Sequence, residues 1–408
     1  MPNPLSGKHI LLGVTGSIAC YKAADLASKL AQVGARVDII LTQAALEFIT
    51  PLTFQSVTGS RAFTDDDLWG SEAHVIHVGL AQDADLLIIA HATANTLAKM
   101  AHGMADNLLT VTALAARCPL LIAPAMDAGM FSNPATQANL EILRQRGVMV
   151  VGPAQGHLAS GLAGLGRMVE PVEILSQARF MVSRGGLLSG KKILVTAGGT
   201  QEPIDPVRSI TNRSSGKQGY AIAQAALDLG AEVVLISGIT SLSAPAGARR
   251  VDVTTGEEML KATLEEVPQA DALVMAAAVA DFQVSDPSSH KIKRGAGGID
   301  LHLQPTHDIL AEVASLRSAR GCPRVIVGFA AESRDLMENA RAKLKSKKLD
   351  FIVANNILAA DAGFYVDTNR VTLLYPDGRS EELPLMSKTQ VAEIVMERVQ
   401  EMLLAREE

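Results

Sequence analysis

The sequence predicts an α/β protein made of two Rossmann-like, doubly wound parallel-sheet domains. Short, continuous apolar runs recur along the chain, as expected of strands buried on both faces, and amphipathic helix patterns separate them. With 408 residues, the chain is longer than one hydrophobic core normally grows. The same order of apolar strand patterns also occurs twice in the sequence. Residues 8–16 are similar to 191–199, residues 34–40 to 230–236, and residues 84–90 to 270–276.

Composition excludes several function classes. Hydrophobic residues make up 48% of the chain, and the formal net charge of −6 argues against nucleic acid or an anionic membrane as a partner. Three widely spaced cysteines, Cys20, Cys118 and Cys322, predict a reducing, cytoplasmic location without a disulfide framework or a CxxC metal site. No apolar run approaches the ~20 residues of a membrane helix, and the first residues do not resemble a signal peptide.

The first domain is expected to span residues 1–184. Its first strand, at 10–14, enters a glycine turn and leads to a helix pattern at 19–33. Further helices are predicted at 93–98, beyond Asp106 and at 134–146, and further strands at 120–123 and 148–151. A glycine-rich linker is expected at 185–190.

The second domain is expected to span residues 191–408. A strand at 193–195 enters the polar stretch 196–219, and a helix pattern at 220–229 leaves it. The stretch 285–298 has the composition of a mobile loop. The remaining predicted elements are a strand at 325–327, a basic helix at 336–348, a strand at 351–353, a hairpin turning at 377–378 and a closing helix that starts near Ser387.

The polar stretch 196–219 organises the second domain. Ser214, Ser215, Gly216 and Lys217 stand where the next helix should begin. Free backbone N–H groups at a helix start, next to small residues, make an anion site, and a lysine adds a point charge suited to phosphate. The alternative is a polar loop with a well-capped helix. A second glycine turn beside a buried strand favours the functional interpretation.

Residues 13–19 of the first domain, GVTGSIA, join a strand to a helix but lack a complete GxGxxG. The pattern therefore indicates only a phosphate or flavin near a helix N-terminus, and a tight turn without a ligand stays possible. Two further strand ends, at 91–95 and 123–127, point to the same edge of the sheet, where ligands of such folds bind.

Several longer motifs of the first domain are more specific. GVTGSIACYKAADL, HVGLAQDADLLIIA, ATANTLAKMAHGMADNLLT, PAMDAGMFSNPATQANL and GLGRM resemble the flavin-dependent cysteine decarboxylases, in particular the phosphopantothenoylcysteine decarboxylase half of the bifunctional proteins of coenzyme A biosynthesis. The resemblance implies a trimer with FMN at a subunit interface. The FMN-binding residues that it implies are Gly16, Ser17, Ile18, Thr42, Thr93, Asn95, Asp106 and Asn107.

The resemblance also implies catalytic residues, two of which depart from the family. His77, rather than His74, matches the family's histidine. Asp127 stands where the family has an asparagine that orients the substrate carboxylate, and Ser160 stands where it has a cysteine that protonates the product. A carboxylate at Asp127 would repel the substrate unless its pKa were raised. A serine hydroxyl is a far weaker acid than a thiol of pKa ~8.5.

Two hypotheses follow from these departures. The decarboxylase works with replaced groups, with His157 or Asp127 as proton donor. Alternatively, the chain is a ligase whose first domain binds FMN but is impaired.

The second domain resembles the phosphopantothenate–cysteine ligases over almost all of 191–408, through the run TAGGTQEPIDPVRSITNRSSGKQG and the segments MAAAVADF, KIK and VGFAAE. The resemblance implies ligation through an acyl-cytidylate, with CTP and Mg²⁺. Asn212 and Lys291 are the catalytic residues that it implies, and Ser214, Ser215, Gly216 and Lys217 hold the substrate phosphate. The implied nucleotide-binding residues are Met275, Ala276, Ala277, Asp281, Lys291, Phe329, Lys343 and Lys347.

The residue types suit that chemistry. Activating a carboxylate with a nucleotide triphosphate concentrates negative charge, which lysines stabilise on the leaving pyrophosphate. Lys343 and Lys347 share a helix face, although such a pair is often only a solvated basic surface. Asp281 can accept hydrogen bonds from ribose hydroxyls or simply cap a turn. The charges do not distinguish CTP from ATP, and the metal ligands are not evident.

The predicted partners are small molecules and further copies of the chain. The resemblance implies a trimeric flavin half and a dimeric ligase half, which together would form a dodecamer. One rival function is a flavin-binding regulatory module. Another is an NAD-linked oxidoreductase, which would need a complete GxGxxG and an acid at the end of the second strand, where the sequence reads Leu41-Thr42-Gln43.

Overall fold

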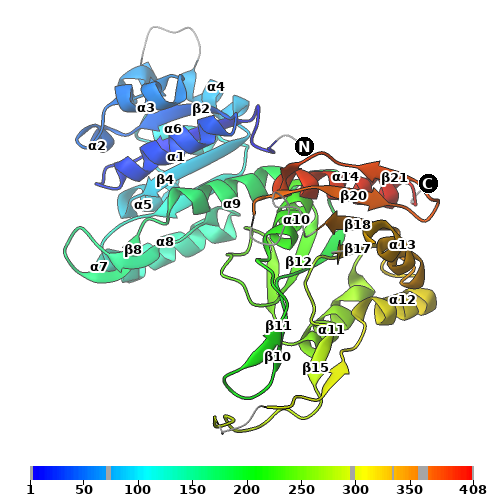
Figure 1. Ribbon diagram of the computed structural model, residues 1–408. Coiled ribbons are helices and arrows are strands. Elements are labelled where there is room, and N and C mark those ends of the chain that lie inside the picture. The colour runs from blue at the N-terminus through cyan, green and yellow to red at the C-terminus, as the bar shows by residue number, and fades with distance from the viewer. Residues whose placement is uncertain (1–2, 70–74, 295–298, 333–334, 357–365, 407–408) are drawn as a thin grey trace. The chain divides into compact units, whose positions relative to one another are not determined.

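The computed structural model describes residues 3–69, 75–294, 299–332, 335–356 and 366–406 (Figure 1). The chain divides into two compact units, Pro2–Ser183 and Arg184–Glu408, with Met1 grouped with the second. None of the helices within these described ranges combines the length and the apolar character needed to cross a bilayer.

The first unit contains a six-stranded, all-parallel sheet. Its spatial order is β3-β2-β1-β4-β5-β6. The order reverses between β1 and β4, and the carboxyl ends of strands beside such a reversal are where these folds bind ligands. The strands are β1 (His9–Val14), β2 (Arg36–Leu41), β3 (Ala62–Phe63), β4 (Leu86–Ala92), β5 (Leu120–Pro124) and β6 (Met149–Val150).

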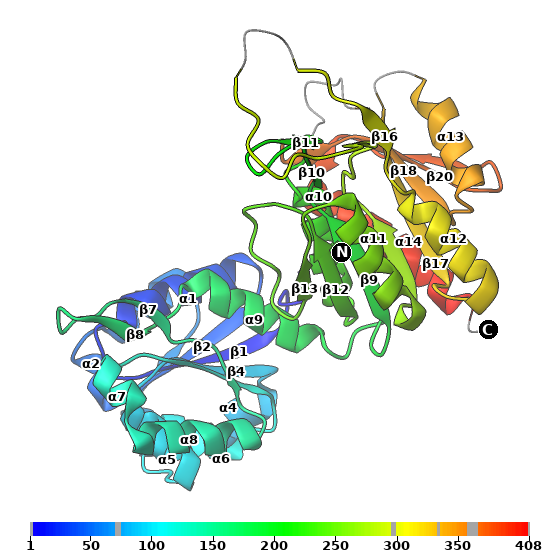
Figure 2. The same cartoon turned by 90° about the horizontal axis from the view of Figure 1, so that it is seen from below.

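Helices cover both faces of this sheet (Figure 2). One apolar core packs the sheet against α1 (Cys20–Gln32), α3 (Pro51–Thr58) and α9 (Pro171–Ser183). The other packs it against α4 (Ile76–Asp83), α5 (Ala94–His102), α6 (Leu108–Ala115) and α8 (Pro134–Gln145). The smaller elements are α2 (Gln43–Leu46), η1 (Asp65–Trp69), α7 (Ala128–Ser132) and the hairpin of β7 (Ala154–His157) and β8 (Ala163–Arg167).

The second unit repeats this plan in a larger sheet. Its order is β13-β12-β9-β14-β17-β18-β20-β21, in which the first six strands are parallel and the last two form an antiparallel hairpin. The strands are β9 (Lys192–Ala197), β12 (Glu232–Ser237), β13 (Arg249–Asp252), β14 (Ala272–Met275), β17 (Val325–Glu332), β18 (Phe351–Asn356), β20 (Val371–Leu374) and β21 (Ser380–Glu382).

Two layers of helices cover this second sheet. α10 (Lys217–Asp228) and α14 (Lys388–Leu404) pack against each other on one face. α11 (Gly256–Glu266), with the short η2 (Val267–Gln269) after it, α12 (Ile309–Arg320) and α13 (Leu336–Ser346) pack on the other face (Figure 2). Three two-stranded ribbons complete the unit: β10 (Gln201–Pro203) with β11 (Ser209–Thr211), β15 (Phe282–Val284) with β16 (Leu303–Pro305), and β19 (Thr368–Asn369) with β22 (Met386–Ser387).

The predicted fold class is confirmed, and the departures are local. The antiparallel β20–β21 edge makes the second sheet mixed rather than wholly parallel. The glycine-rich segment 185–190 packs on the second unit, because Leu188 is fully buried and its N–H donates to Leu229 O at 2.7 Å. In the stretch 285–298, the Ile292 N–H donates to Asp205 Oδ2 at 3.2 Å, so this part of the expected mobile loop is held. Residues 295–298 lie outside the described residues.

Candidate functional site

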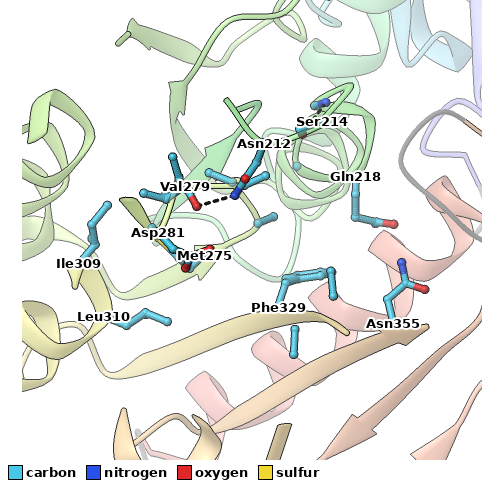
Figure 3. Close-up of a pocket in the computed structure, with 18 of the residues that line it drawn as sticks. Asn212, Ser214, Gln218, Met275, Val279, Asp281, Ile309, Leu310, Phe329 and Asn355 are labelled. Atoms are coloured by element: carbon cyan, nitrogen blue, oxygen red, sulfur yellow. Dashed lines mark hydrogen bonds between the residues drawn. The ribbon is translucent and has the colours of Figure 1, made fainter. Parts of the chain in front are cut away.

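The second unit contains a cavity of about 860 Å³ at the carboxyl ends of β9, β14 and β17 (Figure 3). The polar stretch before α10, the segment after β14 and the segment before α12 form its walls. Its lining includes residues 212–219, 275–281 and 306–310, and also Phe329, Ala330, Ala331, Lys343, Ser346, Lys347, Asn355, Asn369 and Lys388.

Two glycines place the start of α10 at this cavity. Gly216, the N-cap of α10, has a φ of 75°, a conformation that glycine adopts without a steric cost. A Cβ at Gly219 would lie 2.5 Å from Ala197 Cβ and 2.9 Å from Thr196 O, so α10 lies directly on β9. No acidic residue occupies its first turn. The free N–H groups and the positive end of the helix therefore make this wall attractive to an anion.

Asn212 lies a few residues before α10, on the same wall of the cavity. Its Nδ2 donates to Val279 O at 2.8 Å, which links the segment before α10 to the segment after β14 (Figure 3). Asp281, two residues beyond Val279, is exposed and also lines the cavity. An amide and a carboxylate are thus placed beside the helix start.

A basic pair enters the cavity from α13 and the residue that follows it. Lys343 Nζ donates to Phe329 O at 3.0 Å, and the ammonium of Lys347 pairs with Asp308 Oδ2. Burial alone would raise the pKa of Asp308, but the hydrogen bond from Lys347 and the Ala311 N–H outweigh burial and lower it. Asp308 is therefore a carboxylate that pairs with one of the two lysines.

The structure brings together all but one of the predicted ligase residues. The exception is Lys291, which is exposed and lies outside the residues that line this cavity. The lining also includes Gln218, Asn355, Asn369 and Lys388, which the sequence analysis did not identify. Asn355 lies near the end of β18 and Asn369 ends β19, a signal too common to single them out. Lys388 follows Ser387, where the sequence predicted only the start of a helix.

Metal-binding residues are not evident within the described ranges. No group of three or more His, Cys, Asp or Glu side chains there is arranged to hold a metal ion. Among the residues that line the cavity, Asp281 and Asp308 are the carboxylates. Among the described residues, this cavity therefore offers two carboxylates but no cage of protein ligands for a metal ion.

In the first unit, the predicted flavin-binding residues gather at one edge of the sheet. Gly16, Ser17 and Ile18 follow β1, Thr42 follows β2, and Thr93 and Asn95 follow β4. These strands are parallel, so their carboxyl ends meet. A Cβ at Gly16 would lie 2.5 Å from Ala44 Cβ, and the N-cap of α1 makes no side-chain cap bond. The edge thus offers backbone N–H groups beside a residue that has no room for a side chain.

Three further predicted residues of this unit, His77, Asp106 and Asn107, lie in the first turn of a helix or directly before it. His77 is in the first turn of α4 and Asn107 caps α6, accepting from Thr110 N at 2.9 Å. Because these helices lead into β4 and β5, they run antiparallel to the strands and begin at the same carboxyl edge. The carboxylate of Asp106 pairs with Lys99 at 2.8 Å.

Asp127 and Ser160, the two departures from the family, contact each other. Ser160 Oγ donates to Asp127 Oδ2 at 2.7 Å, and the Gly129 N–H donates to Asp127 Oδ1 at 2.9 Å. The Ser160 hydroxyl first, and then the Gly129 N–H, lower the pKa of Asp127. This direction is opposite to the raised pKa that a neutral Asp127 would need.

His91, in β4, was seen only as part of a strand end. It is fully buried, and among the described residues neither ring nitrogen has a hydrogen-bond partner. Burial lowers the pKa of His91 to about 4, so the ring is neutral at physiological pH.

Comparisons with known proteins agree with this division. The flavoprotein family matches residues 1–182, and the "DNA/pantothenate metabolism flavoprotein C-terminal domain" family matches 188–403. The chain therefore has the architecture of a flavoprotein domain followed by a pantothenate-metabolism domain.

Relatives match over both domains at once. The chain is 44% identical over 398 residues to the "Coenzyme A biosynthesis bifunctional protein CoaBC" of Bacillus subtilis (strain 168), covering 97% of each chain. It is 44% identical over 404 residues to the protein of the same name from Mycobacterium tuberculosis (strain H37Rv), covering 96% of each. Among solved structures, the C-terminal domain of a protein of this name is 38% identical, covers 54% of this chain and 99% of that one, and has a TM-score of 0.46. The chain belongs to the family of bifunctional coenzyme A biosynthesis proteins.

Proposed function

We propose that the chain makes 4′-phosphopantetheine in two steps: CTP-dependent ligation of L-cysteine to 4′-phosphopantothenate, and FMN-dependent decarboxylation of the product. The observation that carries the ligase step is the cavity in which Asn212, the start of α10, Phe329 and the Lys343–Lys347 pair meet. The full-length relatives, whose name assigns them two functions in coenzyme A biosynthesis, support the pairing of both steps in one chain.

The ligase step needs an activated carboxylate. The carboxylate oxygen of 4′-phosphopantothenate attacks the α-phosphorus of CTP, pyrophosphate leaves, and an acyl-cytidylate forms. The cysteine amine then attacks the acyl carbon, loses a proton and expels CMP. Lys343 and Lys347 are suited to stabilising the leaving pyrophosphate, with Mg²⁺ carried by its oxygens. Lys291 would join them only by moving to the cavity from its exposed position.

Asn212 and Asp281 orient the reactants in this proposal. Released from Val279 O, the Nδ2 of Asn212 can donate to the acyl carbonyl as negative charge develops there. Asp281 can accept from the ribose hydroxyls, and Phe329 can pack on the base. The side chains do not by themselves select CTP over ATP, so the nucleotide is part of the proposal.

The residues of the first unit fit a bound FMN. The backbone N–H groups at Gly16, Ser17 and Ile18 stand near a helix start and suit its phosphate. A side chain at position 16 would collide with Ala44, so glycine allows this turn. Bound FMN would take two electrons from the thiol-bearing end of the substrate, which eases loss of the carboxylate, and would return them to the decarboxylated product, so that no net oxidation occurs. His77, in the first turn of α4, is placed to hold or take a proton beside this edge.

In this proposal, Asp127 and Ser160 have roles different from those of the asparagine and the cysteine of the resembling family. The Asp127 carboxylate accepts the Ser160 hydroxyl, which orients that hydroxyl and holds its loop. The exposed His157 is the remaining candidate for returning a proton to the product. We propose that the first unit is active with these replacements.

Self-association is part of the proposal for the first unit. Large apolar side chains are exposed around the carboxyl edge: Ile18, Tyr21, Phe48, Met130 and Leu162. Exposed apolar groups gathered at one edge favour burial against another protein surface. A trimer with FMN at its interfaces would supply that surface.

The rival functions are less well supported. An impaired flavin half is not favoured, because the similarity to bifunctional relatives extends over both domains. A purely regulatory flavin module would leave the second cavity without a role. An NAD-linked oxidoreductase is likewise not favoured by a match to coenzyme A biosynthesis proteins over 97% of the chain.

A coupled assay tests the proposal. Purified protein would be supplied with 4′-phosphopantothenate, cysteine, Mg²⁺ and either CTP or ATP, and the products identified by mass spectrometry. Formation of 4′-phosphopantetheine with CTP is expected. Accumulation of the cysteine adduct would reject the decarboxylase step, the absence of any amide product would reject the ligase step, and faster turnover with ATP would reject the nucleotide assignment.

A further inference from the structure

Lys388 reaches the ligase cavity from the far end of the sequence. It is the first residue of α14, only 7% of its surface is exposed, and it lines the same cavity as residues 212–219. Gln218 Nε2 donates to Lys388 O at 3.1 Å, which ties the first turn of α10 to the start of α14. Both helices therefore begin at one wall of the cavity, and both begin with a lysine, Lys217 and Lys388.

Three effects disfavour a positive charge at Lys388. It is buried, it stands at the positive end of a helix, and the ammonium of Lys217 lies nearby. Burial, and then the charge of Lys217, lower the pKa of Lys388. No acidic residue occupies the first turn of α10 or α14 to compensate. An arrangement in which like charges converge on a cavity is stabilised when an anion enters it.

Asp367 is the local counter-ion. Lys217 Nζ contacts Asp367 Oδ1 at 2.6 Å, and the carboxylate is 84% exposed. The Lys388 N–H donates to Asp367 O at 2.9 Å, so the backbone of the same residue is fixed beside the second lysine. An exposed carboxylate on a fixed backbone can turn into water when another anion takes its place. The change costs little free energy, because a solvent-exposed ion pair contributes little to stability.

The same wall carries amide groups. Asn369, which is 3% exposed, and Asn355 line the cavity beside Gln218, and Figure 3 shows Gln218 and Asn355 directed toward each other. Among the described residues, Asn355 Oδ1 and Gln218 Oε1 are buried without a hydrogen-bond partner. These acceptors suit the hydroxyl and amide N–H groups that lie next to the phosphate on a pantoyl arm.

We propose that Lys388 and Lys217 form a two-ammonium subsite for the phosphomonoester of the acid substrate, and that Asp367 neutralises it when it is empty. This assignment rests on the proposed ligase function. The Lys343–Lys347 pair reaches the cavity from the opposite face of the sheet, with α13, so two anionic groups are received from two sides. Nucleotide phosphates and a phosphomonoester are the two such groups that the reaction brings together.

Steady-state ligation by the full chain tests the subsite, with 4′-phosphopantothenate and pantothenate compared as substrates. Lys388→Gln should raise the KM for 4′-phosphopantothenate about 10- to 100-fold, as expected for losing a charged hydrogen bond, and leave the KM for CTP unchanged. Pantothenate should react equally well with both proteins. Lys388→Arg should retain most of the affinity, and Lys261→Gln, on the exposed surface of α11, is the matched control.

Asp367→Asn gives the opposite prediction. Removing the competing carboxylate should lower the KM for 4′-phosphopantothenate about 2- to 5-fold. Because Asp367 is exposed, this variant and Lys388→Arg remain informative if Lys388→Gln is unstable. A rise in the KM for CTP in Lys388→Gln, or weaker binding of 4′-phosphopantothenate by Asp367→Asn, would overturn the assignment.

Calorimetry separates this assignment from the proposed function. The wild-type chain should bind 4′-phosphopantothenate more tightly than pantothenate in the absence of any nucleotide, and Lys388→Gln should abolish the difference. If the chain binds in this way but forms no amide product, the ligase function fails and the phosphomonoester subsite stands. If amide forms but the preference persists in Lys388→Gln, the subsite fails alone.

Discussion

The two units place their candidate residues at the same topological position but enclose them differently. In both sheets the strand order reverses beside the first strand, at β1/β4 and at β9/β14. In the second unit, α10, α12, α13 and α14 surround a cavity, and Lys388 is 7% exposed within it. In the first unit, the corresponding edge carries Ile18, which is 61% exposed. A single chain thus encloses most of the candidate ligase site, whereas the candidate flavin edge leaves a large apolar side chain exposed.

The largest expected effect is a loss of amide formation, without an effect on the flavin half. Asn212→Ala should lower the rate of amide formation about 100- to 1,000-fold, because the acyl carbonyl loses its donor, while pyrophosphate release is largely retained. Rapid-quench measurement of pyrophosphate and amide separates the two steps. The flavin content of the same sample is the internal control, and equal loss of both steps would contradict the assignment.

The next effect concerns the stability of the first unit at acid pH. The pKa of His91 is about 4 in the folded chain against 6.5 for the free side chain, so the unfolded state binds more protons between these values. The free energy of unfolding should fall as pH drops from about 6.5 to 4, by about 3 kcal/mol for this group. Hydrogen exchange at β4 as a function of pH measures it.

His91→Leu should remove most of that pH dependence, because leucine does not titrate. His102→Gln, at an exposed histidine of the same unit, should leave it in place. An unchanged slope in His91→Leu would show that other groups cause it. Amides of β9, in the second unit, should not follow the His91 titration.

A matched glycine pair sharpens the comparison between the units. Added Cβ atoms at Gly16 and Gly219 would each lie 2.5 Å from an alanine Cβ, Ala44 and Ala197 respectively. Alanine at either position should cost about 1–3 kcal/mol of stability through overpacking. Gly16→Ala should weaken FMN binding only, and Gly219→Ala should impair ligation only.

Gly79→Ala is the control for this pair, because an added Cβ there meets nothing within 4 Å. Denaturant unfolding, flavin fluorescence and ligation assays report the three properties. Loss of both functions in either variant would mean that the two sites are not independent.

The smallest expected effect is a gain in the flavin half. Ser160→Cys places a thiol of pKa ~8.5 where a hydroxyl now donates to Asp127, and proton delivery at neutral pH should improve about tenfold. Single-turnover decarboxylation of the cysteine adduct measures the change. Ser160→Ala tests whether the hydroxyl matters at all, and equal rates in all three proteins would assign the proton to another group such as His157.

The fold was largely predictable because buried parallel strands leave continuous apolar runs. The strand Ile193-Leu194-Val195 and the polar stretch after it placed the second site at the end of a strand, and residues 212–219 of that stretch line the cavity. Lys388 was not predictable, because its burial depends on α14 packing beside α10. The contact of Ser160 with Asp127 was not predictable either, because it also depends on tertiary packing. A hairpin brings together these two residues, which are 33 positions apart in the sequence.

The position of α14 also has a consequence for synthesis. Domains fold as units while the chain emerges from the ribosome. The first unit ends at Ser183, so its sheet can form while the rest of the chain is still being translated. Lys388 lines the cavity of the second unit, and α14, which carries it and ends at residue 404, packs on α10. A nascent chain can therefore complete its first sheet well before the wall formed by α10 and α14 exists, and ribosome-bound intermediates should contain a folded first unit without ligating.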